Sequence, residues 1–375
     1  MIYLDYSANT PADSRVLERF CEVERSCPGN ANSRHQAGRD AKLVIDHATQ
    51  SIAGLLSAQP AEVIYTSGAS EANNFALKGL AKLSRHLGKH IISTPLEHSS
   101  VSGTLTALQE QGYEIDLVDI KRDGTIDLDH LKELLRPDTI AVAVTMVDSE
   151  LGVVQPVQEI AEILKEYPHC HLHVDATQAV GKIPVSFEGV DTMSLTAHKF
   201  YGLNGIGLLL KRRNLALEPL IHGGESTTIY RSGTPTVALA SSLALALELA
   251  VEQLPEHAEA VQKANTFLRT ELAKYPKVRI NSPENAIPHI LNLSVQDVKG
   301  TVFQRELNEE GVCVSVKAAC SSDGLPSRAV FAVSRDRRNA LSSWRVSLSH
   351  RTTEEDLRGF LAAFDRCYRR LTETK

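Results

Sequence analysis

One lysine, Lys199, lies in the stretch LTAHKFYG (residues 195–202), next to a histidine, two aromatic residues and a glycine. A lysine is almost never buried without a reason, so a surface charge is the commoner interpretation of such a residue. A buried lysine amine could instead form a Schiff base with a carbonyl group. The stretch by itself favours neither interpretation, and the rest of the chain has to decide.

Other residues that could do chemistry follow short apolar runs of the chain. After VIYT comes SGASEANN, where the backbone amides of Ala69 and Ser70 and the Ser70 hydroxyl could bind a phosphate, although a serine-capped turn is the plainer alternative. His98 follows HIISTPL and could either stack on a flat ring or be an interior histidine. Asp175 follows HLHV, where a buried carboxylate needs a cationic partner unless it caps a helix.

These groups together fit the chemistry of one cofactor. An aspartate can pair with a protonated pyridine nitrogen, a lysine can form a Schiff base, a flat ring can stack, and a small-residue turn can hold a phosphate. That combination is typical of pyridoxal 5′-phosphate (PLP) sites. Each feature is weak alone. Four of them at the ends of four expected strands predict a PLP site.

The apolar pattern predicts the elements that position these residues. Seven short β-branched runs recur between about residues 63 and 212, and helix-like segments separate most of them. This alternation predicts an α/β fold with a mostly parallel seven-stranded sheet, covered by helices on both faces. The last two runs are joined only by KFYGLNG, so we expect them to pair antiparallel. Ligands of such sheets bind beyond the carboxyl ends of the strands.

The length of 375 residues suggests a large domain and a smaller one. We expect residues 16–254 to form the large, cofactor-binding domain. Residues 1–15 and 255–375 are expected to form a smaller α+β domain. The alanine- and leucine-rich segment 237–274 predicts one long helix between them.

Composition narrows the class of protein. A net charge of −6 gives no electrostatic footprint for nucleic acid or an anionic membrane, so we expect neither as a direct partner. No apolar run approaches 18 residues, and the start of the chain lacks the features of a signal peptide. The six cysteines show no CxxC pair and no regular spacing, which argues against disulfides and structural zinc and predicts a cytoplasmic protein.

Two further motifs resemble known binding sites, but neither predicts one here. The glycines of YGLNGIG precede an expected strand instead of opening a helix, so they do not form a dinucleotide-binding motif. The histidines of HCHLHVD have the spacing of metal ligands but no second cluster to complete a site. We therefore expect no metal.

The chain also resembles a known family from end to end. The blocks YLDYSANTP, VIYTSGASEANNFALKG, HVDATQAVGK, LTAHKFYGLNGIG, YRSGTP, AACSS and SSWRVSLS resemble, in order and spacing, those of cysteine desulfurases. These are PLP enzymes of fold type I and of the class-V aminotransferase type. Their reaction removes sulfur from L-cysteine, giving L-alanine and a persulfide on an enzyme cysteine.

The resemblance implies a role for each matching residue. Lys199 would form the Schiff base, Asp175 would pair with the pyridine nitrogen, and His98 would stack on the ring and help to move protons. The remaining implied contacts are Ala69, Ser70, Thr196 and His198 at the phosphate, Gln178 at the phenolic oxygen, Thr234 at the phosphate of a neighbouring subunit in a homodimer, and Arg345 at the substrate carboxylate.

Cys320, in SVKAACSSDGLPS, matches the family's nucleophile, whereas Cys313 is expected to be a packed strand residue. The persulfide sulfur would pass to an acceptor protein. Related enzymes serve iron–sulfur assembly, tRNA thiolation or DNA phosphorothioation, and no residue here reports which acceptor applies.

Two blocks depart from the family pattern. Asp148-Ser149-Glu150 replaces the usual Asn-Asn-Glu, so Ser149 would stand where an asparagine contacts cofactor and substrate. Lys317 and Ala318 replace a serine and a glycine, and a nearby Lys317 could lower the pKa of the Cys320 thiol. Three alternatives stay open: a selenocysteine lyase, another class-V PLP enzyme, and a catalytically silent sulfur-transfer scaffold. The last is disfavoured because Lys199 and Asp175 are both retained.

Overall fold

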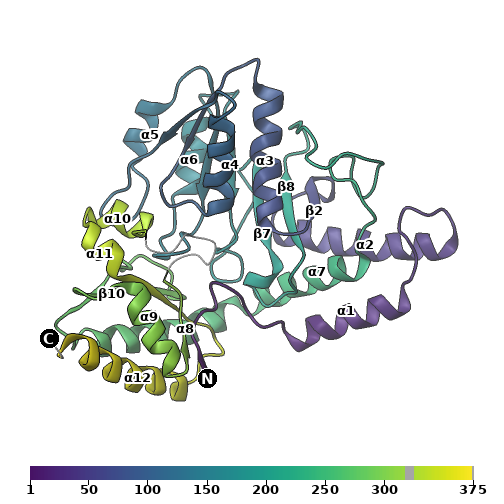
Figure 1. Cartoon of the computed structure of the whole chain (residues 1–375). Coiled ribbons are helices and arrows are strands. Elements are labelled where there is room, and N and C mark those ends of the chain that lie inside the picture. Colours follow the sequence, from purple (N-terminus) through teal and green to yellow (C-terminus); the bar gives the residue numbers. More distant parts are fainter. Residues whose placement is uncertain (317–324, 374–375) are drawn as a thin grey trace.

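The computed structural model describes residues 1–316 and 325–373 (Figure 1). The expected nucleophile Cys320 and its neighbours Lys317 and Ala318 lie outside the described residues.

A seven-stranded sheet forms the centre of the larger part, with the strand order β2-β8-β7-β6-β5-β3-β4. The strand β8 runs antiparallel to both β2 and β7, and all other neighbouring strands are parallel. This confirms the predicted mixed sheet, including the antiparallel pairing of the last two strands. The strands are β2 (Val63–Thr66), β3 (His90–Ser93), β4 (Glu114–Leu117), β5 (Thr139–Thr145), β6 (His171–Asp175), β7 (Thr192–Thr196) and β8 (Gly207–Lys211).

Helices cover both faces of this sheet because its central strands are apolar on both sides. Along β5, Ala141 and Ala143 pack in the core under α3 and α4, whereas Val142 and Val144 belong to the core on the opposite face. That opposite face is covered mainly by α2, α5, α6 and α7. The helices are α1 (Ser14–Ser26), α2 (Gln36–Leu55), α3 (Ala69–Ser84), α4 (Ser99–Gln109), α5 (Leu128–Leu134), α6 (Val157–Leu164) and α7 (Val237–Glu252).

The prediction of a single long helix over residues 237–274 is wrong. The structure has two helices, α7 and α8 (Leu254–Leu272), bent by 65° with respect to each other. Pro255 lies in the first turn of α8, where its missing N–H is tolerated, but inside a continuous helix its ring would clash with the preceding turn. No single helix of residues 1–316 and 325–373 could cross a membrane, and only this bent pair taken together has the length and hydropathy of a span.

The smaller part has its own core. The strands β9 (Val278–Ile280), β10 (Ile290–Val295) and β12 (Ser343–Ser347) form an antiparallel sheet in the order β12-β10-β9. Trp344 packs there against the stacked ring of Phe303 and near Phe364. The covering helices are α8, α9 (Gly300–Glu309) and α12 (Glu354–Thr372). The buried residues of the short helices α10 (Arg328–Ser334) and α11 (Arg337–Ser342) belong instead to the core of the larger part.

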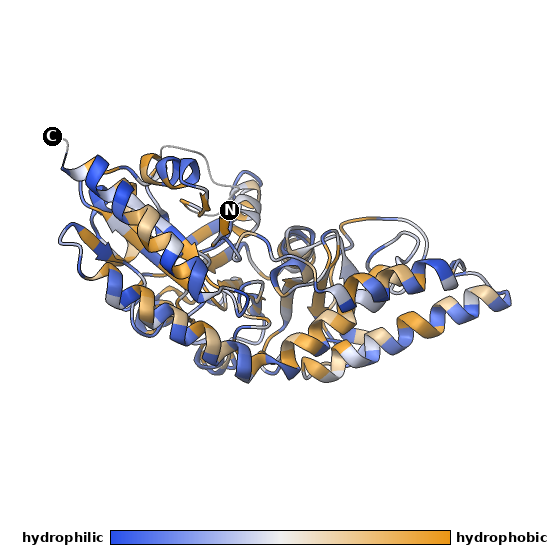
Figure 2. Ribbon diagram, turned by 90° about the horizontal axis from the view of Figure 1, so that it is seen from below, coloured by the Kyte–Doolittle hydropathy of each residue, from blue (hydrophilic) through white to orange (hydrophobic). Residues whose placement is uncertain are grey.

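The helices bury one face each. On α12 the buried residues Leu357, Phe360, Phe364 and Cys367 recur every three or four positions, and Figure 2 shows orange and blue residues alternating along the helices. Such a stripe packs a helix against a sheet or another helix and leaves its other face to water.

The N-terminus belongs to the smaller part. The strand β1 (Ile2–Tyr3) pairs in parallel with β11 (Val312–Cys313), which confirms Cys313 as a strand residue. Figure 1 accordingly shows the purple N-terminus near the yellow helix α12. From there the chain passes the carboxyl end of β7, where Thr10 and Asp13 contact His198 and Tyr201, before α1 begins.

Candidate active site

A pocket of about 360 Å³ lies at the carboxyl ends of the parallel strands β5, β6 and β7, next to the start of α3. The position agrees with the rule that ligands of such sheets bind beyond the strand ends. The pocket brings together ten of the residues singled out in the sequence: Ala69, Ser70, His98, Ser149, Asp175, Gln178, Thr196, His198, Lys199 and Arg345.

Lys199 faces this pocket instead of extending into solvent. It ends a short 3₁₀ turn (Ala197–Lys199) that follows β7 directly. Its Nζ donates hydrogen bonds to the backbone carbonyls of Ser7 and Ala8, both at 2.7 Å. The half-buried amine is therefore positioned by the N-terminal segment, on a turn fixed to the central sheet.

Asp175, the last residue of β6, is a buried carboxylate with a fixed orientation. Its Oδ2 accepts a hydrogen bond from Asn73 Nδ2 at 2.8 Å, and its Oδ1 accepts one from the backbone N–H of Thr177 at 3.0 Å. Asn73 is fixed in turn, because its Oδ1 contacts His173 Nε2 at 3.0 Å. Burial holds the pKa of His173 below its usual range, so the neutral ring donates this hydrogen bond.

His98 precedes α4 and is held by that helix. Its Nδ1 accepts a hydrogen bond from the backbone N–H of Ser100 at 3.2 Å, so the neutral ring carries its proton on Nε2. Burial lowers the pKa of His98, Asp175 raises it, and the positive charge of Lys199 lowers it. The net result is an imidazole that is neutral at neutral pH, next to the lysine amine.

The start of α3 forms one wall of the pocket. The backbone amides of Ala69 and Ser70 belong to its first turn, where unpaired N–H groups and the helix dipole favour an anion. Thr196 Oγ1 and His198 Nδ1 are 3.1 Å apart on the adjacent wall. Burial lowers the pKa of His198 to about 4, with Lys199 acting in the same direction, so this ring is also neutral.

Arg345 reaches the pocket from β12 in the smaller part. Its side chain is only 2% exposed. Nη1 donates to the carbonyl of Ser149 at 2.6 Å, and Nη2 donates to Asp5 Oδ1 at 3.0 Å. The planar guanidinium is thus held on two sides and still lines the pocket, a geometry suited to a carboxylate ligand.

Comparison with known proteins identifies the family to which the chain belongs. The model of the aminotransferase class-V family matches residues 2–360. The cysteine desulfurase IscS of Dictyoglomus turgidum is 37% identical over 375 residues, which cover 99% of this chain and 95% of the relative. The chain belongs to the cysteine desulfurase group of class-V aminotransferases. Its solved structural neighbours agree in fold.

Two solved structures show how closely the fold is shared. A NifS-like protein superposes with a TM-score of 0.92 at 34% identity, covering 99% of both chains. A structure described as SspA in complex with cysteine superposes with a TM-score of 0.83 at 31% identity, covering 94% of this chain and 100% of the other. Both neighbours cover almost the full length, so the class-V desulfurase fold extends over both cores of this chain.

The residues of the pocket fit the PLP of this family. Among the described residues, the buried Gln178 Oε1 and Thr177 Oγ1 have no hydrogen-bond partner, as expected where a polar ligand completes the site. Gln178 Nε2 donates to the carbonyl of Ser7 at 2.9 Å and has a second hydrogen for a phenolic oxygen. With the fixed carboxylate of Asp175 and the helix start at Ala69, the pocket offers a partner for each polar end of the cofactor.

The Asp148 departure has a structural explanation. Asp148 Oδ2 accepts hydrogen bonds from the backbone N–H groups of Glu150 and Leu151, so the side chain closes a local turn and does not line the pocket. Burial, and then the charge of Glu150, raise the pKa of Asp148 to about 7. Ser149 is the residue of this block that faces the pocket.

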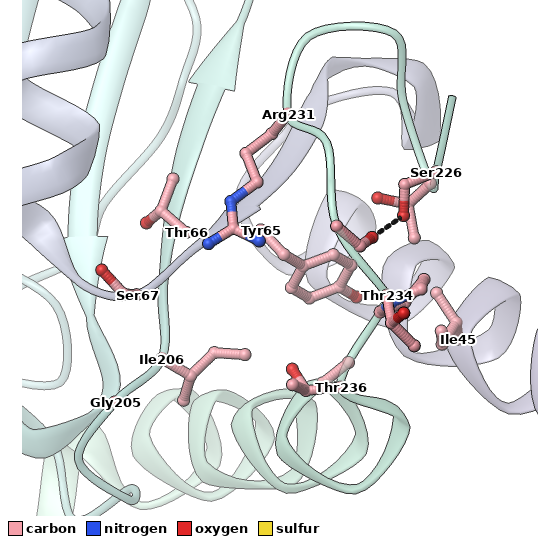
Figure 3. Close-up of a pocket in the computed structure, with 14 residues that line it drawn as sticks. Ile45, Tyr65, Thr66, Ser67, Gly205, Ile206, Ser226, Arg231, Thr234 and Thr236 are labelled. Atoms are coloured by element: carbon pink, nitrogen blue, oxygen red, sulfur yellow. Dashed lines mark hydrogen bonds between the residues drawn. The ribbon is translucent and has the colours of Figure 1, made fainter. Parts of the chain in front are cut away.

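Thr234 is the one described site residue that does not join the lysine pocket. It lines a separate small pocket of about 90 Å³ with Tyr65, Ser226 and Arg231 (Figure 3). Arg231 connects this region to the start of α3, because its Nε lies 3.0 Å from Glu71 Oε1.

Two sets of residues at this site were not predicted from the sequence. One is Asn73, whose only signal is a polar side chain on the sheet-facing side of α3. The other is the N-terminal segment, where Ser7 and Ala8 accept from Lys199, and Thr10 Oγ1 donates to the carbonyl of His198 at 2.9 Å. The block YLDYSANTP marked this segment as part of the family pattern, but not as part of the pocket.

Proposed function

We propose that this chain is a PLP-dependent cysteine desulfurase that converts L-cysteine into L-alanine and a persulfide on Cys320, whose sulfur then passes to a protein acceptor. One observation carries the proposal: a lysine amine, a fixed aspartate and a buried arginine meet in one pocket of a class-V desulfurase fold. The SspA neighbour, described in complex with cysteine, supports L-cysteine as the substrate.

The described residues would hold PLP at each end. Lys199 is the amine that would bind the aldehyde carbon, Asp175 would pair with the pyridine nitrogen, and Gln178 and Ser149 would contact the phenolic side. The phosphate would bind at the start of α3, with Ala69, Ser70, Thr196 and His198 around it. When bound, PLP supplies an electron sink for bond cleavage at the substrate.

The protein's own groups perform the binding and proton transfers. Arg345 receives the substrate carboxylate through its fixed guanidinium. His98 is neutral at neutral pH, so it can take up a proton from the substrate side, and Lys199 can shuttle a second proton.

Cys320, assigned by the family match, attacks the substrate sulfur as a thiolate. The carbon–sulfur bond breaks, a sulfur–sulfur bond forms, and the former Cβ gains a proton to become the methyl group of alanine.

The assembly of the protein is also part of the proposal. We infer a homodimer in which Thr234 contacts the phosphate of the partner subunit's cofactor, since Thr234 is exposed and lies outside the lysine pocket of its own chain. The division into residues 16–254 and residues 1–15 with 255–375 is supported by a hydrophobic core drawn only from the second set, although Ile287, Ile290 and the helices α10 and α11 pack into the core of the first. A cytoplasmic location accords with six cysteines that show no CxxC pair and no regular spacing, and a lack of direct contact to nucleic acid or membrane accords with the net charge of −6.

The test is product formation by the purified protein. With PLP and L-cysteine, the wild type should give alanine and a protein-bound persulfide in equal amounts during a single turnover. Lys199→Ala should give neither, and Cys320→Ala should give no persulfide. Cys313→Ala is the matched control, because this neighbouring cysteine is a strand residue and should leave both products unchanged.

Bound PLP without alanine would contradict desulfuration and point to another substrate of the class. Release of selenium from selenocysteine with no reaction of L-cysteine would show a selenocysteine lyase. A protein that binds no PLP would be a sulfur-transfer scaffold.

A further inference from the structure

The N-terminal segment lies beside the two strands that lead into the substrate end of the pocket. On one side, the backbone N–H of Leu4 donates to the carbonyl of Cys313 at 3.0 Å, extending the pairing of β1 with β11. On the other side, the N–H of Ser347 on β12 donates to the carbonyl of Leu4 at 2.8 Å. The next residue, Asp5, is therefore fixed beside Arg345.

The carboxylate of Asp5 joins two partners from these strands. Its Oδ1 accepts a hydrogen bond from Arg345 Nη2 at 3.0 Å, and its Oδ2 accepts one from Ser315 Oγ at 2.7 Å. Ser315 and Arg345 are also joined by backbone hydrogen bonds in both directions. Because each oxygen has a different partner, the carboxylate cannot rotate without losing a hydrogen bond.

Arg345 needs this anion. A buried guanidinium without a counter-charge is costly, and the Arg345 side chain is only 2% exposed. Among residues 1–316 and 325–373, Asp5 is the one carboxylate within ion-pair distance of it. The other hydrogen-bond acceptor, the carbonyl of Ser149, carries no net charge. Together the two contacts set the plane of the guanidinium and leave its remaining N–H groups for a ligand.

We propose that Asp5 is a positioning residue for substrate recognition, which holds Arg345 in the orientation that receives the substrate carboxylate, while Ser315 fixes Asp5. This inference rests on the proposed function, in which Arg345 binds that carboxylate. It assigns a role to an N-terminal residue 340 positions away from the arginine that it serves.

The test compares Asp5→Ala, Asp5→Asn and Ser315→Ala with the wild-type enzyme loaded with PLP. In Asp5→Ala we expect KM for L-cysteine to rise about tenfold, the size of effect that follows loss of a hydrogen bond to a charged group. kcat should change much less than KM. In Asp5→Asn, KM should rise less, because the amide oxygen can still accept a hydrogen bond from Arg345 Nη2. In Ser315→Ala, KM should show part of the increase seen in Asp5→Ala. Asp46→Asn, a surface ion-pair residue on α2, should equal the wild type.

A binding experiment separates positioning from general damage. Dissociation constants of L-alanine and of ethylamine, which lacks the carboxylate, are measured from the change in cofactor absorbance. Asp5→Ala should weaken the binding of L-alanine about tenfold and leave the affinity for ethylamine unchanged. Equal weakening of the binding of both amines would overturn the proposal. A lower KM in Asp5→Asn would also overturn it, because it would show that Asp5 competes with the substrate carboxylate for Arg345. A wild type that binds L-alanine but makes none from L-cysteine would contradict the proposed function alone.

Discussion

At the residue scale, the site depends on polar side chains whose partners come from different elements. Asn73 on α3 is the clearest example, because its amide donates both to Asp175 Oδ2 at 2.8 Å and to Ser100 Oγ at 2.9 Å. The same Ser100 hydroxyl contacts His98 Nδ1 at 2.9 Å. One buried amide therefore sets the geometry of the Asp175 carboxylate and, through Ser100, of the His98 ring.

We predict that Asn73→Ala weakens PLP binding by roughly 10- to 100-fold, because a hydrogen bond to a charged group contributes roughly 1.5–3 kcal/mol. The dissociation constant would be measured from PLP absorbance after equilibrium dialysis. Asn74→Ala is the matched control, since within residues 1–316 and 325–373 the Asn74 amide donates only to the carbonyl of Ser70 on its own helix. Equal affinities of the two variants would show that Asn73 does not position Asp175.

At the element scale, the start of α3 is positioned by close packing against β8. A Cβ on Gly207 would lie 2.7 Å from the Cα of Gly68 and 2.6 Å from the carbonyl oxygen of Leu195, so only glycine lets the strand approach the helix start. The backbone amides at the start of α3, proposed to bind the phosphate, therefore take their place from a contact between two glycines that are distant in sequence.

We predict that Gly207→Ala displaces the start of α3, lowers the stability of the protein by about 1–3 kcal/mol, and weakens binding of PLP. Urea unfolding measures the first effect and PLP titration the second. Gly224→Ala is the control, because nothing lies within 4 Å of a Cβ there. Unchanged PLP affinity in Gly207→Ala would show that the helix start tolerates the shift.

At the scale of the whole molecule, titratable groups lie buried where the two cores meet. His289 is 6% exposed, and its Nδ1 has no hydrogen-bond partner among the described residues. Burial lowers the pKa of His289 to about 3, and the positive charges of Lys182, His350 and His257 act in the same direction. In the unfolded chain the same imidazole titrates near pH 6.5.

The unfolded chain therefore binds one more proton at His289 between pH 6.5 and about 3. The contribution of the neutral His289 to stability is fully present above pH 6.5. As the pH decreases through this window, the loss of that contribution lowers the free energy of unfolding by about 1.4 kcal/mol per pH unit. We predict that His289→Gln makes this slope shallower by about that amount, measured by urea unfolding at pH 7, 6 and 5. The exposed His86→Gln should keep the wild-type slope, and a wild-type slope in His289→Gln would contradict the prediction.

The sequence by itself determined the order of the elements and the residues at the strand ends. Apolar runs of strand length separated by helical segments predicted the sheet, and the short KFYGLNG link predicted the antiparallel β8. Parallel strands end at one edge, so Asp175 and Lys199 were expected together, and both line the pocket. The family blocks added Arg345, which periodicity alone could not place.

Only the tertiary structure decided how those residues are held. Asp5 reaches Arg345 across 340 positions, and Asn73 reaches Asp175 across 102. Neither contact has a local pattern, because hydrogen bonds between distant segments depend on how the elements pack and not on their spacing in the chain. The bend at Gln253 differs, because its signal, Pro255, is local: alanine and leucine favour a helix on both sides of the proline, and the composition of the whole segment outweighed it in the prediction.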